Sequence, residues 1–269
     1  MACIDKPFAA CFNAETRKTA LGKAERAVER FLTISTNIGF SLVSGAKILD
    51  FGCGGGHHVH VLLAHGYDAW GYDILPRQES IGRKERLAFY DKNRRGGNRA
   101  IDWNTFCLPY TDNSFDAICS FQVLEHVMRH DLVFREFGRV MKEGAVSINI
   151  FPPRNKPWEE HIKVPFGHLV HHMTYYYIMA KLGYRKNAHL SPRATAERNY
   201  RYIRDYVNYL PNKELRRIAS QYFNYVRIDP TAHVLGAKLS PVRHWLRSHF
   251  GRSICLVMAD KAIAGRRAS

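Results

Sequence analysis

The apolar positions of this chain fall into short runs separated by amphipathic stretches, the pattern of alternating strands and helices. Residues 48–51 are apolar except for Asp50 and predict a buried strand. Glycines at 52, 54 and 56 then predict a tight turn, and residues 57–63 predict a helix. A strand that ends in such a turn is typical of a nucleotide site, because glycine lets a ligand approach the backbone N–H groups at the helix start.

The same pattern continues along the chain and predicts a doubly wound α/β fold. Strands are expected at residues 68–72, 98–102, 115–120, 145–151, 223–228 and 254–259. Helices are expected at residues 13–44, 77–95, 131–141 and 195–209. Because a crossover fits between successive strands up to residue 151, the sheet is expected to be parallel over that part.

The glycine spacing narrows the class of nucleotide. A dinucleotide fingerprint needs G-x-G-x-x-G, and its third glycine would fall on position 57, where this chain has His57. The spacing present is D-x-G-x-G-x-G, starting at Asp50. Asp73 ends the second expected strand, 17 residues after Gly56 (73 − 56), where an acid can bind both ribose hydroxyls.

Three motifs together resemble those of the class I S-adenosylmethionine-dependent methyltransferases, in particular the type 11/23-like members. The turn from Asp50 resembles motif I of that family. Residues 108–120 (LPYTDNSFDAICS) and 121–127 (FQVLEHV) resemble its LPF-x-D-x-SFD strand and LEHV helix start. The resemblance covers roughly residues 45–155. It implies a Rossmann-like methyltransferase fold with seven strands, the last antiparallel, and S-adenosyl-L-methionine as cofactor.

The resemblance also implies site residues and a domain plan. Asp102 would bind the adenine amino group, Trp103 would lie against the ring, and Gln122 beside the methionine half. The full expected cofactor set is Asp50, Gly52, Cys53, Gly54, Gly56, Asp73, Ile74, Asp102, Trp103 and Gln122. One methyltransferase domain is expected over 1–269, divided into a helical cover (13–44), a cofactor-binding core (45–151), a helical substrate-side insertion (152–220) and C-terminal strands with a basic tail (221–269).

Histidines are the candidate catalytic residues, because methyl transfer to a hydroxyl or amine can need a general base and histidine titrates near neutral pH. His126 is expected one turn into the helix after the fourth strand. It aligns with the histidine of a Tyr–His pair in phosphoethanolamine methyltransferases, although this chain has no tyrosine before Tyr67. His161, in the insertion, is the second candidate. No metal is expected, since the E-x-x-E-H metal helix of related enzymes has Gln122 at its first carboxylate position.

Charge is concentrated in the C-terminal third. The chain carries a formal net charge of +16. Residues 181–269 hold 18 Lys/Arg and 5 Asp/Glu, a net charge of +13, which leaves +3 for residues 1–180. This favours an anionic partner: a small or glycan-like substrate, an anionic surface contacted peripherally, or nucleic acid. A solvated basic face is the alternative, and the oligomeric state stays open.

The remaining signals bear on compartment and activity. Six cysteines lack any C-x-x-C pair, so neither a zinc site nor a disulfide framework is indicated, and a cytoplasmic protein without a membrane span is expected. The leading prediction is a methyltransferase for an oxygen or nitrogen of a small or glycan-like, anionic acceptor. An RNA methyltransferase is the alternative, although residues 120–123 (SFQV) replace the N/D-P-P-Y/F tetrapeptide of base-modifying enzymes. A non-enzymatic cofactor-binding protein is the third interpretation.

Overall fold

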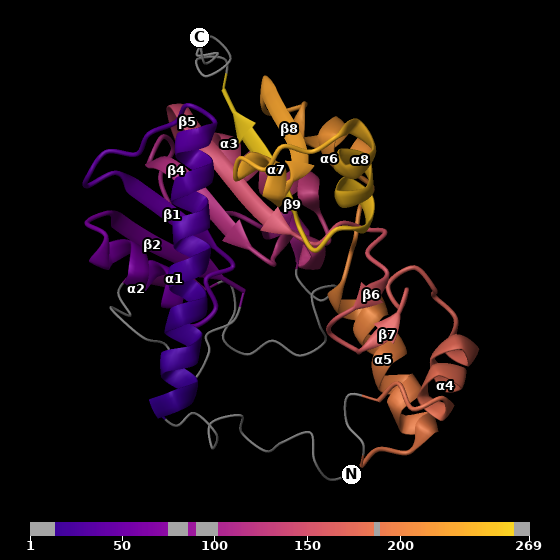
Figure 1. Cartoon of the computed structure of the whole chain (residues 1–269). Helices are drawn as coiled ribbons and strands as arrows, with labels where there is room; N and C mark the ends of the chain where they lie inside the picture. Colours follow the sequence, from indigo (N-terminus) through magenta and orange to yellow (C-terminus); the bar gives the residue numbers. More distant parts are fainter. Residues whose placement is uncertain (1–13, 75–85, 90–101, 186–188, 261–269) are drawn as a thin grey trace.

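A central seven-stranded sheet organises the fold (Figure 1). The computed structural model describes residues 14–74, 86–89, 102–185 and 189–260. Its strand order is β3-β2-β1-β4-β5-β9-β8. The strands are β1 (Lys47–Phe51), β2 (Asp68–Asp73), β3 (Leu87–Phe89), β4 (Phe115–Phe121), β5 (Met141–Phe151), β8 (Tyr225–Pro230) and β9 (Ile254–Ala259).

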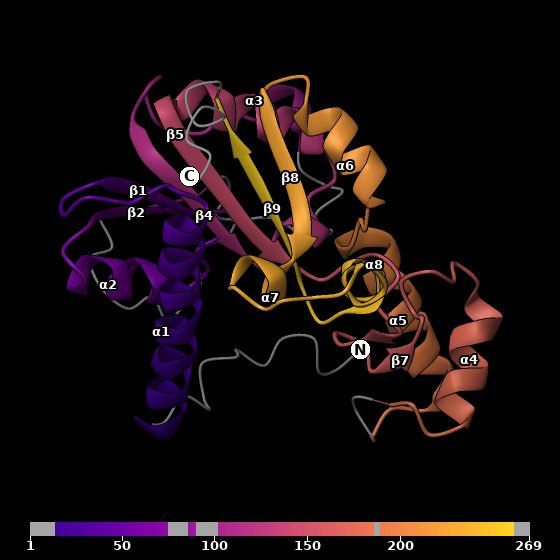
Figure 2. The ribbon, with the colours of Figure 1, turned by 45° about the horizontal axis from the view of Figure 1, so that its top comes forward.

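The sheet is mostly parallel, as predicted. Strands β1 to β5 pair in parallel, whereas β9 runs antiparallel to both β5 and β8. Figure 2 shows β8 and β9 side by side at one end of the sheet. Strand β9 has the predicted bounds and is buried along its whole length, because helices cover both faces of the sheet there.

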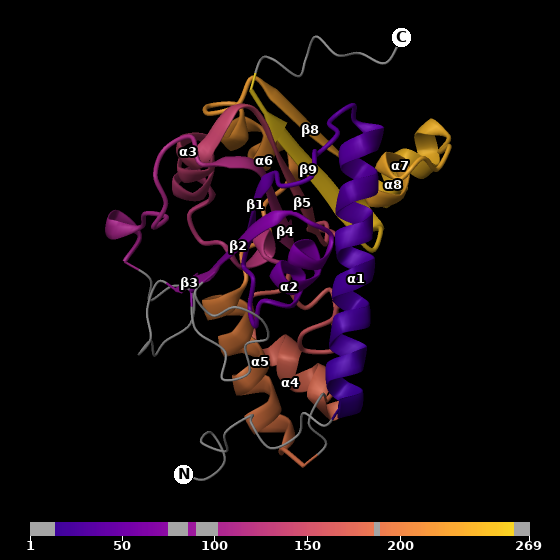
Figure 3. The same ribbon diagram turned by 90° about the vertical axis from the view of Figure 1, so that its left-hand side faces the viewer.

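Two helical layers enclose the sheet (Figure 3). Helices α1 (Ala14–Asn37), α2 (His57–Ala64) and α7 (Thr231–Val234) pack on one face, and α3 (His130–Val140) and α6 (Asn212–Ala219) on the other. The predicted apolar stripe of α1 is its buried side, with Val28 and Phe31 fully enclosed. The doubly wound Rossmann-like fold is therefore confirmed.

The N-terminal helix is shorter than predicted. It ends at Asn37 and not near residue 44, because Gly39 takes a left-handed φ of 80° and the Phe40 N–H donates to Ser35 O. Its described side chains pack against α2 and the sheet, and none of them lines the cavity at the carboxyl ends of β1 and β2.

The helix expected over residues 77–95 is wrong at residues 87–89, which form a strand, and the strand expected over residues 98–102 stays a prediction. Residues 98–101 lie outside the described part of the chain, and β3 is formed by Leu87–Phe89, inside the stretch predicted as a helix over 77–95. Leu87, Ala88 and Phe89 pair in parallel with the end of β2. The open edge of β2 offers hydrogen bonds that outweigh the local helical preference of a charged stretch.

The helix expected at the FQVLEHV motif is also replaced. Residues Leu124–His126 form a single 3₁₀ turn, and α3 begins only at His130. His126 therefore lies in a connection between strand and helix, and not one turn inside a helix. The backbone N–H of Asn208 donates to Glu125 O at 2.7 Å, so the chain after α5 supports this turn.

Residues 152–185 and 189–209 form a lobe beside the carboxyl ends of β4 and β5, at the lower right of Figure 1. It contains the paired strands β6 (Trp158–Glu159) and β7 (Val164–Pro165), then α4 (Met173–Lys181) and α5 (Pro192–Tyr206), before α6 returns to the sheet. A separate small core holds it together: Ile162, Val164, Tyr176, Ala196, Ile203 and Val207. The last helix, α8 (Pro241–Phe250), packs against β8, and no helix in the described residues is long and apolar enough to cross a bilayer.

Candidate functional site

The turn after β1 is shaped by a glycine that no other residue can replace without a shift. Gly52 has a φ of +82°, and a Cβ placed there would lie 2.2 Å from Cγ2 of Val123. The N–H groups of Gly52 and Cys53 both donate to Tyr72 O, at 2.7 and 3.1 Å. These contacts join the end of β1 to the end of β2.

Asp73 fixes the second side of the site. One carboxylate oxygen accepts the Gly54 N–H and the other accepts the Ile74 N–H, each at 2.7 Å. A carboxylate has about four lone-pair sites, so both oxygens keep the capacity to accept ribose hydroxyls. Asp73 thereby couples the glycine turn to the strand that faces it.

A cavity of about 190 Å³ opens where these elements meet. Trp103 contributes an indole Nε1 that is buried and makes no hydrogen bond within the described residues, so a donor stays available to a ligand. Half of the predicted cofactor set lines this cavity, namely Gly52, Asp73, Ile74, Trp103 and Gln122, together with Phe51, Tyr72, Phe106, Val123, His126 and Val127.

The other half of the predicted set lies outside that lining. Asp50 is buried behind the turn, where Nδ1 of His58 lies 3.3 Å from its carboxylate. Cys53 fills the space beside Gly71, and Gly54 holds Asp73. Gly56 takes a φ of 78° at the start of α2, and Asp102 caps the 3₁₀ turn that carries Trp103 by accepting the Asn104 N–H at 3.0 Å. These residues support the walls of the cavity from behind.

The two predicted catalytic histidines come from separate segments and lie together, with 5.0 Å between their ring centroids. Nδ1 of His126 lies 2.7 Å from Tyr206 O and donates to it, so Nε2 carries the lone pair. Burial lowers the pKa of His126 to about 4, although the bond to Tyr206 O opposes the shift. His126 is therefore neutral at neutral pH and a weak base.

His161 is held by a buried carboxylate. Its Nδ1 lies 2.6 Å from Oε1 of Glu159, and its backbone N–H donates to the same oxygen at 3.0 Å. Nδ1 of His168 lies 3.4 Å from the other carboxylate oxygen. Burial alone would raise the pKa of Glu159, but the bonds from His161 and the neighbouring His168 hold it well below its ordinary value. Glu159 stays ionised and keeps Nε2 of His161 as the proton acceptor.

A second cavity, of about 250 Å³, adjoins the first at Gln122. We call it the acceptor cavity. Gln122 and Lys163 take left-handed φ values of 57° and 59°, which are uncommon without glycine and cluster at functional sites. The residues that line it are Gln122, Pro152, Lys156, Trp158, Glu160, His161, Lys163 and Tyr209.

Four residues at or behind the acceptor cavity are not among the predicted site residues: Glu125, Glu159, His168 and Tyr209. Glu159 and His168 stand in the E-x-H-I-x-x-P-F-x-H string that continues from the fifth strand, so that string was the available signal. No sequence motif marks Tyr209, because this residue reaches the cavity only through the folding of the lobe. Glu125 lies behind the site, and burial, with the charge of Glu159, raises its pKa to about 8.

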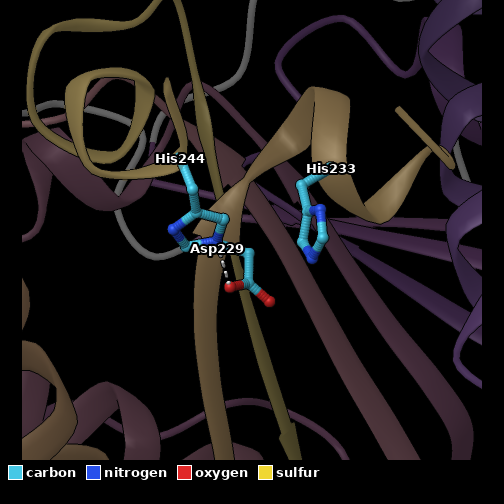
Figure 4. A group of neighbouring side chains, drawn as sticks. All are labelled: Asp229, His233 and His244. Carbon is cyan, nitrogen blue, oxygen red and sulfur yellow. Dashed lines mark hydrogen bonds and ion pairs between the residues drawn. The ribbon is translucent and has the colours of Figure 1, made fainter. Parts of the chain in front are cut away.

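A further polar cluster lies at the end of β8, outside both cavities (Figure 4). Asp229 accepts a bond from His244 Nε2 at 3.0 Å, and Arg227 pairs with its other carboxylate oxygen. His233 lies opposite, with 5.0 Å between its ring and that of His244. Because Arg227 and His244 already satisfy the carboxylate, the cluster ties α8 to β8.

The fold and cavity define a nucleotide-type cofactor domain with its ligand at the carboxyl ends of parallel strands. Residues 49–148 match a family model described as a methyltransferase domain. The chain is 29% identical over 123 residues to the O-methyltransferase rstn1 of Aspergillus nomiae, covering 45% of this chain and 52% of that protein. It is 30% identical over 128 residues to norajmaline N-methyltransferase of Rauvolfia serpentina, covering 44% and 40%.

A solved structure gives the same fold. A putative methyltransferase from an antibiotic biosynthesis pathway of Anabaena variabilis aligns with a TM-score of 0.50 at 13% identity, covering 87% of this chain and 96% of that one. Over residues 49–148 these matches support a class I S-adenosylmethionine-dependent methyltransferase domain. The chain spans about half, or less, of the length of these curated relatives.

Proposed function

We propose that this protein binds S-adenosylmethionine in the cavity at the end of β1 and transfers its methyl group to an oxygen or nitrogen of a small, anionic acceptor held in the acceptor cavity. The observation that carries the proposal is the meeting of two cavities at Gln122, one lined by predicted cofactor residues and the other by His161 and two lysines. When bound, S-adenosylmethionine supplies an electrophilic methyl group on a sulfonium.

Positioning is the first contribution of the chain, because in-line displacement gains chiefly from held geometry. Gln122 closes the end of β4 with a backbone conformation set by the Gln122 N–H bond to Ile150 O at 2.8 Å. Its side chain borders both cavities and separates cofactor from acceptor. The acceptor atom is expected to lie on the His161 side of this residue.

The charge of the acceptor cavity supports an anion. Lys156 pairs with Glu160, whereas Lys163 makes no ion pair within the described residues. Two lysines against one exposed carboxylate leave a net positive lining. Burial and the charge of Glu159 hold the pKa of Tyr209 far above its ordinary value, so its hydroxyl stays a donor for an anionic oxygen.

His161 is the general base of the proposal. Its Nδ1–H is held by ionised Glu159, so Nε2 can take the proton that the acceptor hydroxyl or amine loses as its bond to the methyl group forms. His126, with a pKa of about 4, is too weak a base to accept this proton efficiently near neutral pH. It packs edge to face against His161 and positions that ring.

A reducing compartment such as the cytoplasm belongs to the same proposal, because Cys53, Cys119 and Cys255 are free thiols in the core. Nucleic acid is the less favoured acceptor, since the acceptor cavity is a hollow of only about 250 Å³ lined by two lysines.

Labelled-cofactor transfer to pools of small carboxylates, phosphorylated amino alcohols, phenols and RNA tests the proposal. With an accepted substrate, His161→Gln should lower kcat about 10²- to 10⁴-fold, the usual contribution of a general base. Lys163→Ala should raise KM and leave kcat nearly unchanged, because it removes binding and no chemistry. S-adenosylhomocysteine affinity should stay constant in both variants.

His171→Gln is the matched control, since His171 is an exposed histidine of the same lobe outside the acceptor cavity. It should leave kcat and KM unchanged. Transfer to RNA alone, or an His161→Gln enzyme as active as the parent, would contradict the proposed acceptor class or the proposed base.

A further inference from the structure

Helix α8 exposes its apolar side to solvent and turns its polar side toward the sheet, the reverse of a helix that only covers a sheet. Covering helices bury their apolar side and expose their polar side. Here the inward residues are polar, because His244 bonds to Asp229 (Figure 4) and Ser248 is buried. The outward residues are apolar and widely exposed: Val242 (68%), Trp245 (54%), Leu246 (44%) and Phe250 (42%).

The exposed apolar residues lie on one face of the helix, with the half-buried ring of His249 packed among them. At about 100° per residue, positions 242, 245, 246 and 250 span an arc of about 140°, and positions 244 and 248 lie nearly opposite. The Trp245 and Phe250 rings pack together, with 5.9 Å between centroids. The bond from His244 to Asp229, and that from Asn212 Nδ2 to Ser248 O at 3.4 Å, hold the helix so that this face points to solvent.

Unpaired cations border the apolar face. Arg243 and Arg247 lie next to it on one side of the helix, and Arg252 is the second residue after the helix. No ion pair joins any of the three to an acid within the described residues. A cavity of about 390 Å³ lies beside them, lined by Pro230, Ala232, Arg247, Phe250, Gly251, Arg252 and Ser253. Two guanidinium groups and a hydroxyl at one hollow are suited to a phosphate oxygen.

We propose that α8 docks this protein onto an anionic phospholipid bilayer, with its apolar face in the interface and Arg247 and Arg252 on a lipid phosphate. A helix with Trp, Phe and Leu on one face and arginines beside it is the pattern of helices that lie in the plane of a membrane surface. The net charge of +13 over residues 181–269 attracts the same surface. Aliphatic Val242 and Leu246 contribute nothing to a nucleic acid backbone, so a bilayer fits better than RNA.

Co-sedimentation of the full chain with extruded vesicles tests this docking. Binding is expected with phosphatidylcholine–phosphatidylglycerol vesicles and not with phosphatidylcholine alone, and it should fall as salt rises. Trp245→Ser/Leu246→Ser should lower the partition coefficient at least about tenfold, since two buried apolar side chains are lost. Arg243→Gln/Arg247→Gln should lower it roughly fivefold per charge.

Ile178→Ser/Leu182→Ser, at the C-terminal end of helix α4, is the matched control, because these side chains are also exposed and apolar, and it should bind as the parent does. The docking proposal is wrong if the parent protein ignores anionic vesicles, if the serine variant of α8 binds equally well, or if that variant only converts a dimer into a monomer. It is also wrong if RNA is bound and only the arginine variant loses it. Methyl transfer to a water-soluble acceptor should be unchanged in every α8 variant, so failure here is distinct from failure of the proposed function.

Discussion

Substituting Gly52 by alanine isolates the geometry on which the cofactor turn depends. Two costs follow from the structure. A left-handed φ of +82° costs an alanine roughly 1–2 kcal/mol, and an added Cβ that would meet Val123 Cγ2 at 2.2 Å forces a shift of roughly 1–3 kcal/mol. Gly52→Ala should therefore lower the free energy of unfolding by about 2–5 kcal/mol.

Urea unfolding of five proteins separates the two costs: the parent, Gly52→Ala, Gly144→Ala, Val123→Ala and the double variant Gly52→Ala/Val123→Ala. Gly144 has a φ of +75°, and an added Cβ there would meet nothing within 4 Å, so Gly144→Ala should show the backbone cost alone. Adding Val123→Ala to Gly52→Ala removes both methyl groups that overlap and should recover about 1–3 kcal/mol relative to additivity. The reasoning fails if Gly52→Ala lowers the free energy of unfolding no more than Gly144→Ala does. It also fails if adding Val123→Ala restores none of the stability that Gly52→Ala loses, because the close approach of residues 52 and 123 would then cost nothing.

Three other perturbations follow from the same geometry. Asp73→Ala should weaken S-adenosylhomocysteine binding in calorimetry by about 1–3 kcal/mol, because charge-assisted ribose hydrogen bonds and the bond to the Gly54 N–H are lost together; equal affinity would remove Asp73 from the site. Burial raises the pKa of Glu125 from 4.5 to about 8, so between these values the folded state keeps a proton that the unfolded chain has released. The free energy of unfolding should then fall as pH rises from 6.5 to 8, by up to about 1.4 kcal/mol per unit, above the range in which His126 titrates. Urea titrations should show this slope flattened in Glu125→Gln, and an unchanged slope would assign it to another group. Raising salt until the Debye length shrinks from about 10 Å to about 3 Å should raise the acceptor KM and leave cofactor affinity nearly constant, and equal responses would contradict capture of an anion by Lys163.

Short sequence motifs were sufficient to predict those parts of the site that are built from residues adjacent in the chain. The glycine turn, Asp73 and the strand ending at Gln122 each belong to a short motif whose physical requirements stand in the sequence itself. Half of the predicted cofactor residues line the cavity for that reason. The other half were assigned by motif membership, although they lie in the supporting walls, as Asp50 does beside His58.

The errors share one cause. The charged stretch over 77–95 reads locally as a helix, yet Leu87–Phe89 pairs with β2 because the edge of an existing sheet offers partners that the local sequence does not reveal. The prediction of a helix at residue 126 is wrong for a related reason, because a contact distant in the chain decides the local structure. The 3₁₀ turn at this residue is held by the chain near Asn208, some eighty residues away.

Sequence alone determined the α/β class, the cofactor turn and the family resemblance, since hydrophobic periodicity and glycine spacing are local properties. Tertiary structure alone brought His126 beside His161, placed Glu159 behind that ring and joined two cavities at Gln122. It alone showed that the apolar residues of α8 point outward, because their periodicity is that of any buried helix and only the contacts of His244 and Ser248 fix which side faces the sheet. Burial and long-range contacts, which set these pKa values and surfaces, are properties of the folded chain.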